Sequence, residues 1–400
     1  MRVAQISVHG CPIRSLGGKD TGGMNVYVRE LSRGLGKLGL SVDVFTRWHD
    51  PNDPEVLSIG EKVRLIHIAA GEPEDTPKTD IYSCLPEFLR NLHAFLEREG
   101  AAYDLLHSHY WLSAAAADQF TARAKAPHVA TFHTLGEVKN RARPAETEPA
   151  LRLEVERAVV PTADAIVAFT AEEKDNLINI YGAHPDRVSI VPCGTDLGLF
   201  HPLDRERARD ELGIDDHTKV LLFAGRLQPF KGTDILLRAA ASLADSRDVR
   251  LLVLGGDADS ADEMTRLRSL SSELGIEEKV AFCGIVEHGR MPVFYGAADV
   301  CVVPSFHESF GLVAVEALAC GTPVVASRVG GLATIVRDGE TGYLVDEHTP
   351  EAFAQRLDLL LSNERLLRRM GKAAPSSVVQ YSWPTVTRQV LEVYQGLVGN

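Results

Sequence analysis

The chain has 400 residues, with 42 basic and 55 acidic side chains, a formal net charge of −13 and a hydrophobic fraction of 45%. This length exceeds what one compact core usually holds, so two domains are expected, and the composition excludes a disordered or fibrous chain. The acidic balance and the lack of a basic run argue against a nucleic-acid partner, although local Lys and Arg residues could still bind an anionic substrate.

The cysteines and the N-terminal segment indicate a cytoplasmic protein. Six cysteines are scattered along the chain without CxxC or zinc-ligand spacing, which favours a reducing compartment. Cys283 and Cys301 lie in apolar runs and are interpreted as small core residues. The stretch from Met1 to His9 is short and interrupted by polar residues, so it predicts a first strand and not a signal peptide. No apolar stretch approaches about 18 residues, so no membrane span is expected.

Short apolar runs alternate with segments of helical periodicity in the first half of the chain. The predicted strands are Val3–Val8, Val42–Thr46, Val63–Ile68, Leu105–His107, His128–Phe132 and Ala165–Phe169. After the first strand, an apolar helix stripe is predicted from the spacing of Tyr27, Leu31, Leu35 and Leu38. Such alternation predicts a parallel sheet covered by helices.

A glycine pair, Gly22-Gly23, lies between the first strand and its helix. Glycines at this place let backbone N–H groups approach an anion at a helix N-terminus, and a plain tight turn is the open alternative. The preceding Gly17-Gly18 gives the wrong spacing for the GxGxxG dinucleotide fingerprint. The second strand also lacks the acidic residue that would complete this fingerprint, so a nicotinamide-dependent enzyme is disfavoured.

The segment Val191–Pro202 is rich in Pro and Gly and marks a domain boundary. A second β/α series begins at Lys219, with predicted strands Val220–Ala224, Leu251–Leu254, Val280–Cys283, Val300–Val303 and Pro323–Ala326. We therefore predict an α/β fold of two Rossmann-like domains, residues 1–195 and residues 196–379. Ligands bind at the C-terminal ends of strands in such sheets, so two facing domains would define a cleft.

Two cations follow the first predicted strand of the second series. Arg226 and Lys231 lie in the loop Gly225–Gly232, just beyond the strand's carboxyl end. They could hold a diphosphate and offset the charge of a leaving group. A solvated loop with incidental charges is the alternative.

The segment Pro304–Pro323 carries the sharpest pattern. A loop with Glu308 follows the strand Val300–Val303, and a helix is predicted from near Phe310 onward. The N–H groups of Gly311 and Leu312 would then form a phosphate site at the helix N-terminus. Glu316 follows about one and a half turns later, and the apolar neighbours of both glutamates argue against a solvated face. Each carboxylate can accept hydrogen bonds from a pair of hydroxyls, as in a sugar or a ribose.

Together these residues resemble the retaining glycosyltransferases of family 4, which have the GT-B fold. The matching features are the E-x7-E spacing from Glu308 to Glu316, the GRLxPxKG loop at Gly225–Gly232 and the Gly330-Gly331 turn. The resemblance covers nearly the whole chain. It implies two Rossmann-like domains whose parallel sheets face each other across a deep cleft. The final helix, about residues 380–400, would pack back on the first domain.

Within the family, the chain is most similar to members that transfer N-acetylglucosamine from UDP-N-acetylglucosamine onto 1D-myo-inositol 3-phosphate, the first step of mycothiol biosynthesis. The runs that carry this similarity are Asp20–Val28, Ile68–Gly71, His107–Ser113, Thr131–Leu135 and Val138–Asn140. Sucrose-phosphate synthases and mannosyl or glucosyl transferases of the family also take phosphorylated or polyol acceptors, and they remain alternatives.

On the donor side, the resemblance assigns the diphosphate to Arg226 and Lys231, the transferred sugar to Glu308 and the ribose to Glu316. His133 would lie beside the donor sugar, and it joins Arg226, Lys231 and Glu308 in the implied catalytic set. The remaining donor-binding positions that it implies are Gly22, Gly23, Phe310, Gly311 and Leu312.

The acceptor pocket implied by the resemblance consists of Asn25, Lys78, Tyr110, Thr134 and Arg152. Lys78 and Arg152 suit a phosphate, Tyr110 and Thr134 its oxygens, and Asn25 a ring hydroxyl. Taken singly, Lys78 and Arg152 would be interpreted as surface charges, and only the match of the whole set favours a binding role.

The two glutamates are both assigned to hydroxyl binding, so neither serves as the nucleophile of a retaining glycosidase. We therefore expect front-face substitution, in which the departing diphosphate takes the acceptor's proton and is stabilised by Arg226, Lys231 and a helix N-terminus. No metal or other cofactor is then required, and the DxD sequence Asp257-Ala-Asp259 is interpreted as a solvated turn. A homodimer is compatible with the resemblance.

Two other classes of function compete with a transferase. A non-hydrolysing sugar-nucleotide epimerase would need acid and base side chains around the sugar, and the acceptor set speaks against it. A non-catalytic sugar-nucleotide binding module would be favoured by loss of Lys231 or Glu308, and both residues are present.

Overall fold

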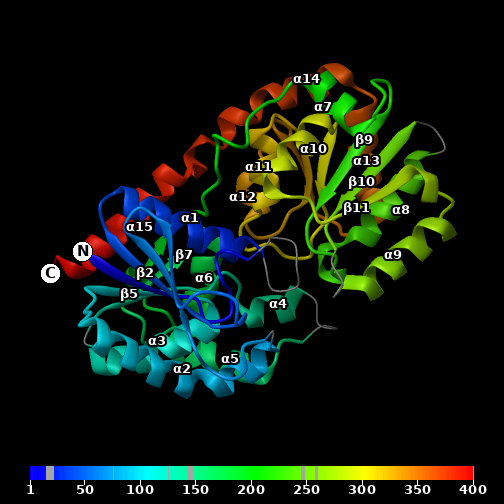
Figure 1. Cartoon of the computed structure of the whole chain (residues 1–400). Coiled ribbons are helices and arrows are strands. Elements are labelled where there is room, and N and C mark those ends of the chain that lie inside the picture. Colours follow the sequence, from blue (N-terminus) through cyan, green and yellow to red (C-terminus); the bar gives the residue numbers. More distant parts are fainter. Residues whose placement is uncertain are drawn as a thin grey trace. The chain divides into compact units, whose positions relative to one another are not determined.

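The computed structural model describes residues 1–14, 22–74, 76–124, 126–142, 147–244, 248–256 and 260–399. It separates the chain into two compact units. The first unit contains Met1–Arg14, Gly23–Gly194 and Trp383–Asn400, and the second contains Thr195–Ser382. In each unit a twisted sheet lies between two layers of helices (Figure 1).

The first unit is built on an eight-stranded sheet in the order β3-β4-β2-β1-β5-β6-β7-β8. Its strands are β1 (Arg2–Ile6), β2 (Ser41–Arg47), β3 (Val56–Gly60), β4 (Val63–Ile68), β5 (Leu105–His109), β6 (His128–Thr131), β7 (Ala165–Ala168) and β8 (Val188–Ile190). Within the described residues every pairing is parallel except that of β3 with β4. The antiparallel edge strand β3 corrects the prediction of a purely parallel sheet.

The helices of the first unit cover both faces of this sheet. They are α1 (Gly23–Lys37), α2 (Lys78–Glu99), α3 (Tyr110–Ala124), α4 (Gly136–Ala142), α5 (Ala150–Val159), α6 (Ala171–Tyr181) and α15 (Trp383–Val398). Helices α1 and α15 lie together on one side, and α2, α3 and α5 lie on the other (Figure 1).

The predicted stripe on α1 is correct for three of its four members. Tyr27, Leu31 and Leu35 are fully buried, whereas Leu38 is 45% exposed. The helix ends at Lys37, so Leu38 has left the helical face that points to the sheet. Periodicity alone did not fix this end.

The last helix, α15, packs against α1 within the first unit. Val386, Val390 and Tyr394 are its fully buried residues. Leu391, Val393 and Leu397 on the same helix are only half-buried. Tyr394 takes the central place, and its hydroxyl contacts the ring of His107 at the heart of the unit.

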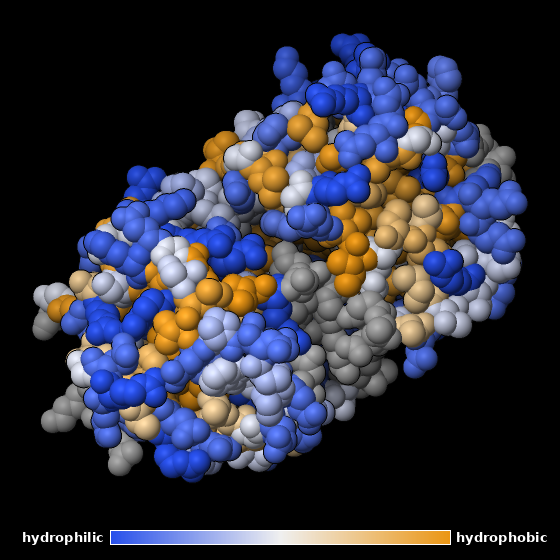
Figure 2. Space-filling model, in the orientation of Figure 1, coloured by the Kyte–Doolittle hydropathy of each residue, from blue (hydrophilic) through white to orange (hydrophobic). Residues whose placement is uncertain are grey.

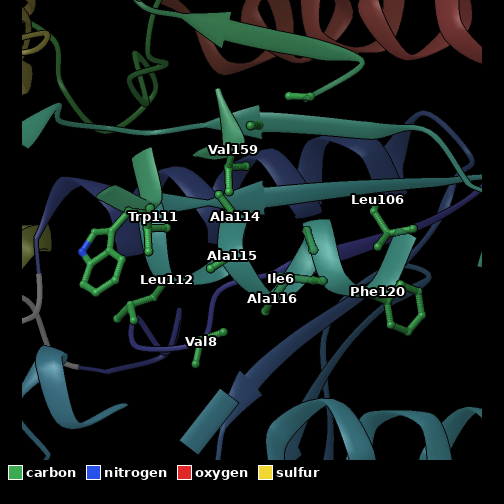
Figure 3. Packing of buried hydrophobic residues seen from close by; sticks show 14 of the residues in the cluster. Ile6, Val8, Leu106, Trp111, Leu112, Ala114, Ala115, Ala116, Phe120 and Val159 are labelled. Atoms are coloured by element: carbon green, nitrogen blue, oxygen red, sulfur yellow. The ribbon is translucent and has the colours of Figure 1, made fainter. Parts of the chain in front are cut away.

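The core of the first unit forms where α3 meets the central strands. Figure 3 shows this packing for a set of buried side chains from β1, β5 and α3, which includes Ile6, Val8, Leu106, Trp111, Leu112, Ala114, Ala115, Ala116 and Phe120. The alanine run lets α3 approach the sheet closely, while Trp111 and Phe120 fill the wider space at its two ends.

The second unit is built on a six-stranded parallel sheet in the order β11-β10-β9-β12-β13-β14. Its strands are β9 (Lys219–Ala224), β10 (Val249–Leu254), β11 (Val280–Gly284), β12 (Val300–Val303), β13 (Val324–Ser327) and β14 (Gly342–Val345). Each of the five predicted strands is present within two residues of its expected bounds. Cys301 is fully buried as expected, but Cys283 is only half-buried because β11 is an edge strand.

Helices α8 (Thr233–Ala244), α9 (Ala261–Glu273) and α13 (Pro350–Leu361) lie on one side of this sheet, and α10 (Met291–Ala297), α11 (Leu312–Ala319) and α12 (Leu332–Ile335) lie on the other (Figure 1). The remaining helices of the unit are α7 (Arg205–Leu212), which packs on α10, and α14 (Glu364–Ala373). Hydrophilic side chains cover most of the face of each unit that Figure 2 shows. Among the helices of the described residues, none combines the length and apolar character of a membrane span.

The start of α6 contains an acid whose burial makes stability depend on pH. Thr170 caps the helix by accepting from the Glu173 N–H, and the Glu173 carboxylate accepts from the Phe169 N–H at 2.7 Å. Burial raises the pKa of Glu173 from an ordinary value of 4.5 to about 7, despite this hydrogen bond. Between these two values the folded state holds a proton that the unfolded state has lost, so stability falls as the pH rises through this range.

Replacing Glu173 by Gln should therefore change the pH dependence of stability. From pH 5 to pH 8 the wild type should lose roughly 2 kcal/mol of unfolding free energy relative to Glu173→Gln. Urea unfolding of both proteins at the two pH values measures this difference. Parallel curves for the two proteins would mean that Glu173 is ionised in the folded state throughout.

Candidate functional site

The residues singled out in the first unit gather at the C-terminal edge of its sheet. Tyr110 directly follows β5 and opens α3, and Thr134 comes three residues after the end of β6. Lys78 is the first residue of α2, and Arg152 lies near the start of α5. The parallel topology thus brings together side chains that are separated by up to 74 residues in sequence.

Arg152 is held by a dense network and is 1% exposed. Its Nε donates to Glu156 Oε1 at 2.7 Å and its Nη1 to Glu148 Oε2 at 2.8 Å. Its Nη2 donates to the carbonyl and the hydroxyl of Thr134, at 2.7 and 2.8 Å. The interpretation of Arg152 as a surface charge is therefore wrong, because the guanidinium ties α5 to the loop after β6.

The ring of Tyr110 lies close to two cations. The Arg152 guanidinium carbon is 4.8 Å from the ring centroid, and Lys78 Nζ is 5.8 Å from it. Tyr110 adopts a φ of +77°, which a non-glycine residue rarely does and which is typical of functional sites. Lys78, Tyr110, Thr134 and Arg152 therefore form one cluster, named here the cationic cluster.

Asn25 is held at a different part of the same edge. It is buried on α1, and its Nδ2 donates to the carbonyl of Cys11 at 2.7 Å. This bond fixes the side chain against the loop that follows β1. The inclusion of Asn25 with the other four residues rests on the resemblance.

His9 is a site residue that sequence reasoning missed. Its ring centroid lies 4.6 Å from that of Tyr110, and its buried Nδ1 has no hydrogen-bond partner among the described residues. Burial, together with the nearby Lys78, His133 and Arg152, holds the pKa of His9 well below its ordinary value. A signal was present, because His9 directly follows the predicted strand Val3–Val8 and the strand-end rule applies to it as well.

Glu148 was also missed, and it lies beside the cationic cluster. Its carboxylate forms ion pairs with Lys139 and Arg152. Burial alone would raise the pKa of Glu148, but these two cations hold it below its ordinary value. The position of Glu156, four residues after Arg152, could have revealed an ion pair on a helix, whereas Glu148 precedes α5.

Residues that the resemblance assigns to the donor lie at strand ends of the second unit. The loop after β9 contains the short helix η2 (Pro229–Lys231), and Lys231 forms an ion pair with Glu308 Oε1. Gly232 has a φ of +68°, and a Cβ there would lie 2.2 Å from the carbonyl oxygen of Pro304. Only glycine lets this loop approach the end of β12 so closely, and the approach brings Lys231 to Glu308.

Glu308 is an ionised, partly buried carboxylate. Burial would raise its pKa, but Lys231 and a 3.2 Å hydrogen bond from the Ser305 hydroxyl keep the pKa of Glu308 below its ordinary value. Its side chain is 19% exposed. The carboxylate is therefore accessible to a ligand while it is held in one position.

The N-terminus of α11 follows Glu308. Gly311 precedes this helix with a φ of +110°, and no side-chain cap is found there among the described residues. The helix begins at Leu312, two residues later than predicted, and Phe310 is buried against Tyr381. The first N–H groups of α11 are thus arranged as in an anion site at a helix N-terminus.

The Gly330-Gly331 turn supports the Glu308 loop. Gly331 N–H donates to the Glu308 carbonyl at 2.9 Å, and a Cβ on Gly330 would lie 1.9 Å from this oxygen. Gly330 also has a φ of +46°. The backbone of the turn therefore packs directly on the backbone that carries Glu308.

Replacing Gly330 by Ala should lower the unfolding free energy by roughly 2–4 kcal/mol, because the new methyl group would displace the Glu308 loop and the residue would be strained. Gly339 is the matched control, since its φ is +77° but a Cβ there would meet nothing within 4 Å. Gly339→Ala should cost only about 1 kcal/mol. Urea unfolding measures both, and equal losses would mean that the contact with Glu308 adds nothing.

Glu316 is buried on α11 and already has partners. Its Oε2 accepts from the Tyr295 hydroxyl at 2.8 Å, and its Oε1 lies 3.4 Å from His288 Nε2. Tyr295 and His288 orient this carboxylate, and neither was identified from the sequence.

Arg226 is half-buried in the loop after β9, as expected for a residue at a strand end.

Some sequence features fall outside the described residues. They are the Asp257-Ala-Asp259 motif, Gly17-Gly18 and the start of the run Asp20–Val28. In the part of the chain that the structure describes, no group of three or more His, Cys, Asp or Glu side chains is arranged to hold a metal ion.

Comparison with known proteins gives the family. Residues 21–199 match the model for Glycosyltransferase Family 4, and residues 204–377 match that for Glycosyl transferases group 1. The D-inositol 3-phosphate glycosyltransferase of Corynebacterium glutamicum is 41% identical over 100% of this chain and 98% of its own length. D-inositol 3-phosphate glycosyltransferase 2 of Catenulispora acidiphila is 42% identical over 98% of this chain and 94% of its own.

Solved structures agree with this assignment. Sucrose-phosphate synthase from Thermosynechococcus elongatus is 34% identical, with a TM-score of 0.93, over 100% of this chain and 99% of its own. The glycosyltransferase WaaG is 19% identical with a TM-score of 0.74 over the full length of both chains, which supports the fold alone. The chain therefore belongs to glycosyltransferase family 4 and has the GT-B fold of these enzymes.

Proposed function

We propose that this protein transfers N-acetylglucosamine from UDP-N-acetylglucosamine onto 1D-myo-inositol 3-phosphate with retention of configuration. The observation that carries the acceptor class is the cationic cluster, in which Lys78 and Arg152 flank Tyr110 beside the Thr134 hydroxyl. Two cations and two hydroxyls at one strand edge suit a phosphate monoester. The inositol ring is suggested by the names of relatives that are 41–42% identical over nearly the whole chain.

The nucleotide-sugar donor would bind to residues of the second unit. Arg226 and Lys231 would bind the diphosphate, and the N–H groups of Gly311 and Leu312 would donate hydrogen bonds to its other oxygens. Glu308 would hold hydroxyls of the transferred sugar. Its pairing with Lys231 supports this role, because the same ammonium could neutralise the carboxylate and attract the phosphate next to the sugar. Glu316, oriented by Tyr295, would accept from the ribose hydroxyls.

In the proposed reaction, the bond between the anomeric carbon and the diphosphate oxygen breaks. The acceptor hydroxyl attacks from the same face, and its proton passes to the departing phosphate oxygen. Charge builds up on that oxygen, so Arg226, Lys231 and the α11 N-terminus would stabilise the transition state more than the ground state. Glu308 and Glu316 both form polar contacts with other side chains, which suits ligand binding better than nucleophilic attack.

A second candidate has its own support. The 34% identity and the TM-score of 0.93 to sucrose-phosphate synthase favour a hexose phosphate as acceptor, since the same cationic cluster would bind its phosphate. Both candidates share the fold, the donor machinery and the phosphate. They differ in the ring that the acceptor presents.

An assay of UDP release separates them. UDP-N-acetylglucosamine would be offered with 1D-myo-inositol 3-phosphate, with fructose 6-phosphate, or without acceptor, each with and without EDTA. We expect release only with inositol phosphate and a rate that EDTA changes by less than about two-fold, because cationic side chains serve the leaving group. Release with fructose 6-phosphate would favour the second candidate. Turnover only with UDP-glucose, GDP-mannose or ADP-glucose would reject the proposed donor.

A further inference from the structure

Two histidines from neighbouring strands meet at the edge of the first sheet. His109 ends β5, and His133 comes two residues after the end of β6. The parallel register pairs His109 with Thr131, which places the two rings close together. His109 Nδ1 lies 3.2 Å from His133 Nε2, so one nitrogen donates to the other.

Both rings are neutral. His109 is fully buried and His133 is 9% exposed. Burial lowers the pKa of His133 to about 3, and burial with the nearby His107 and His133 lowers the pKa of His109 well below its ordinary value. A neutral imidazole carries one proton, so one ring nitrogen donates and the other accepts. Two arrangements of the pair are therefore possible.

The surroundings of the other His109 nitrogen distinguish these arrangements. His109 Nε2 is buried and has no hydrogen-bond partner among the described residues. A proton on Nε2 would bury an unpaired N–H donor, which is costly and rare in proteins. A proton on Nδ1 is used in the bond to His133, and only a lone pair is left without a partner.

We propose that His109 is a positioning residue whose Nδ1–H donates to His133 Nε2 and holds His133 in the neutral tautomer with its proton on Nδ1. His133 then meets a ligand as a hydrogen-bond donor and not as a base. The link from this tautomer to catalysis rests on the proposed function, together with the family resemblance that assigns His133 a place beside the donor sugar. The tautomer itself concerns the free protein.

The need for such support follows from the backbone of His133. Its φ of +62° is unusual for a non-glycine residue, and such a conformation persists where surrounding contacts determine it. The bond from His109 is one of these contacts. A second is the ring of Tyr27, which packs edge-on against both rings with centroids 5.8 Å from His109 and 5.2 Å from His133.

His109 also packs against a third histidine, His107. The ring of His107 lies 4.2 Å from it, centroid to centroid. His107 is fixed at both nitrogens, because Nδ1 contacts the Tyr394 hydroxyl at 2.6 Å and Nε2 contacts the Thr131 hydroxyl at 2.8 Å. The arrangement therefore extends from α15 through His107 and His109 to His133.

Nitrogen-15 NMR of the full-length, ligand-free protein tests the tautomer directly. The chain has 14 histidines, so the His133 signals would be assigned by their loss in His133→Gln. We expect a protonated Nδ1, an unprotonated Nε2 and no titration between about pH 6 and pH 8. In His109→Leu the His133 signals should shift toward a tautomer mixture. A protonated Nε2 on His133 in the wild type would overturn the proposal.

Kinetics test the consequence for turnover. The amide nitrogen of Asn can occupy nearly the place of His Nδ1, whereas Leu provides no donor. We expect His109→Leu to lower kcat roughly 10- to 100-fold, and His109→Asn to recover most of this loss. The control is His128→Asn, which removes a buried histidine that contacts Ser108 and not His133, and should keep at least about half of kcat.

Each result has a distinct meaning. Equal losses in His109→Leu and His109→Asn, with both proteins folded by circular dichroism, would overturn the positioning role. If no substrate pair of the UDP-release assay is turned over, the proposed function fails, while the NMR experiment still decides the tautomer of His133.

Discussion

Replacing Lys231 by Met should lower kcat by about 100- to 1,000-fold, with a smaller change in acceptor KM. Lys231 is the proposed partner of the diphosphate, and its charge would matter most when the leaving group becomes more negative. The same substitution removes the cation that holds Glu308 ionised. Burial would then dominate, the pKa of Glu308 would rise, and the folded state would become less stable at neutral pH. Steady-state UDP release and urea unfolding measure the two effects.

The double variant Lys231→Met/Glu308→Gln separates catalysis from stability. Since Gln carries no charge, it removes the cost of an unpaired carboxylate, and the double variant should regain roughly 1–3 kcal/mol of unfolding free energy over Lys231→Met. Its kcat should remain as low as that of Lys231→Met. If the double variant regained activity together with stability, Lys231 would serve only to neutralise Glu308 and would not act on the diphosphate.

The sequence predicted the fold well where apolar runs are buried. Strands such as Val63–Ile68 and Val300–Val303 appear with the expected bounds, because buried parallel strands read as continuous apolar runs. Three strands were missed, namely β3, β8 and β14, and two of them show the reason. β3 is an exposed antiparallel edge strand, and β14 begins at a glycine that allows close contact with Val324. Neither carries the pattern of a buried strand.

The candidate site was predicted in part for a related reason. Strand-end positions can be identified from the chain order, which gave Arg226 and would also have given His9, whereas Tyr110 and His133 were assigned from the family resemblance. Contacts between side chains depend on which strands are neighbours. The meeting of His109 and His133 requires the pairing of β5 with β6, which periodicity does not provide.

Helix spacing predicts one of the ion pairs of Arg152. Glu156 follows Arg152 by four residues, which places both on one helix face, whereas Glu148 precedes α5. Burial of this group could not be read from the residue types, because charged residues are usually exposed. In the structure the Arg152 and Glu156 side chains are 1% and 0% exposed, so their pairing is a strong constraint on the site.

Replacing Arg152 by Lys should raise acceptor KM about 100-fold or more while the dissociation constant of the donor changes less than about two-fold. Lysine keeps the charge, but one ammonium cannot reproduce the planar set of bonds from Arg152 to Glu156, Glu148 and Thr134. Thr134 would lose its fixed position, and the phosphate would lose a directed partner. Initial rates with varied acceptor, and calorimetry with UDP, measure the two constants.

Glu148→Gln is the matched control for this prediction. It removes one carboxylate from the same network but leaves the bonds of Arg152 to Glu156 and Thr134 in place. Glu148 also neutralises Lys139, so removing the Glu148 charge makes the C-terminal edge of the first sheet more positive. The acceptor KM should therefore stay level or fall. An acceptor KM that rises less than about three-fold in Arg152→Lys, with a normal fold, would show that Arg152 only braces α5 and the loop after β6. Binding of the acceptor phosphate would then depend on Lys78 and Tyr110, and Arg152 would no longer belong to the proposed acceptor site.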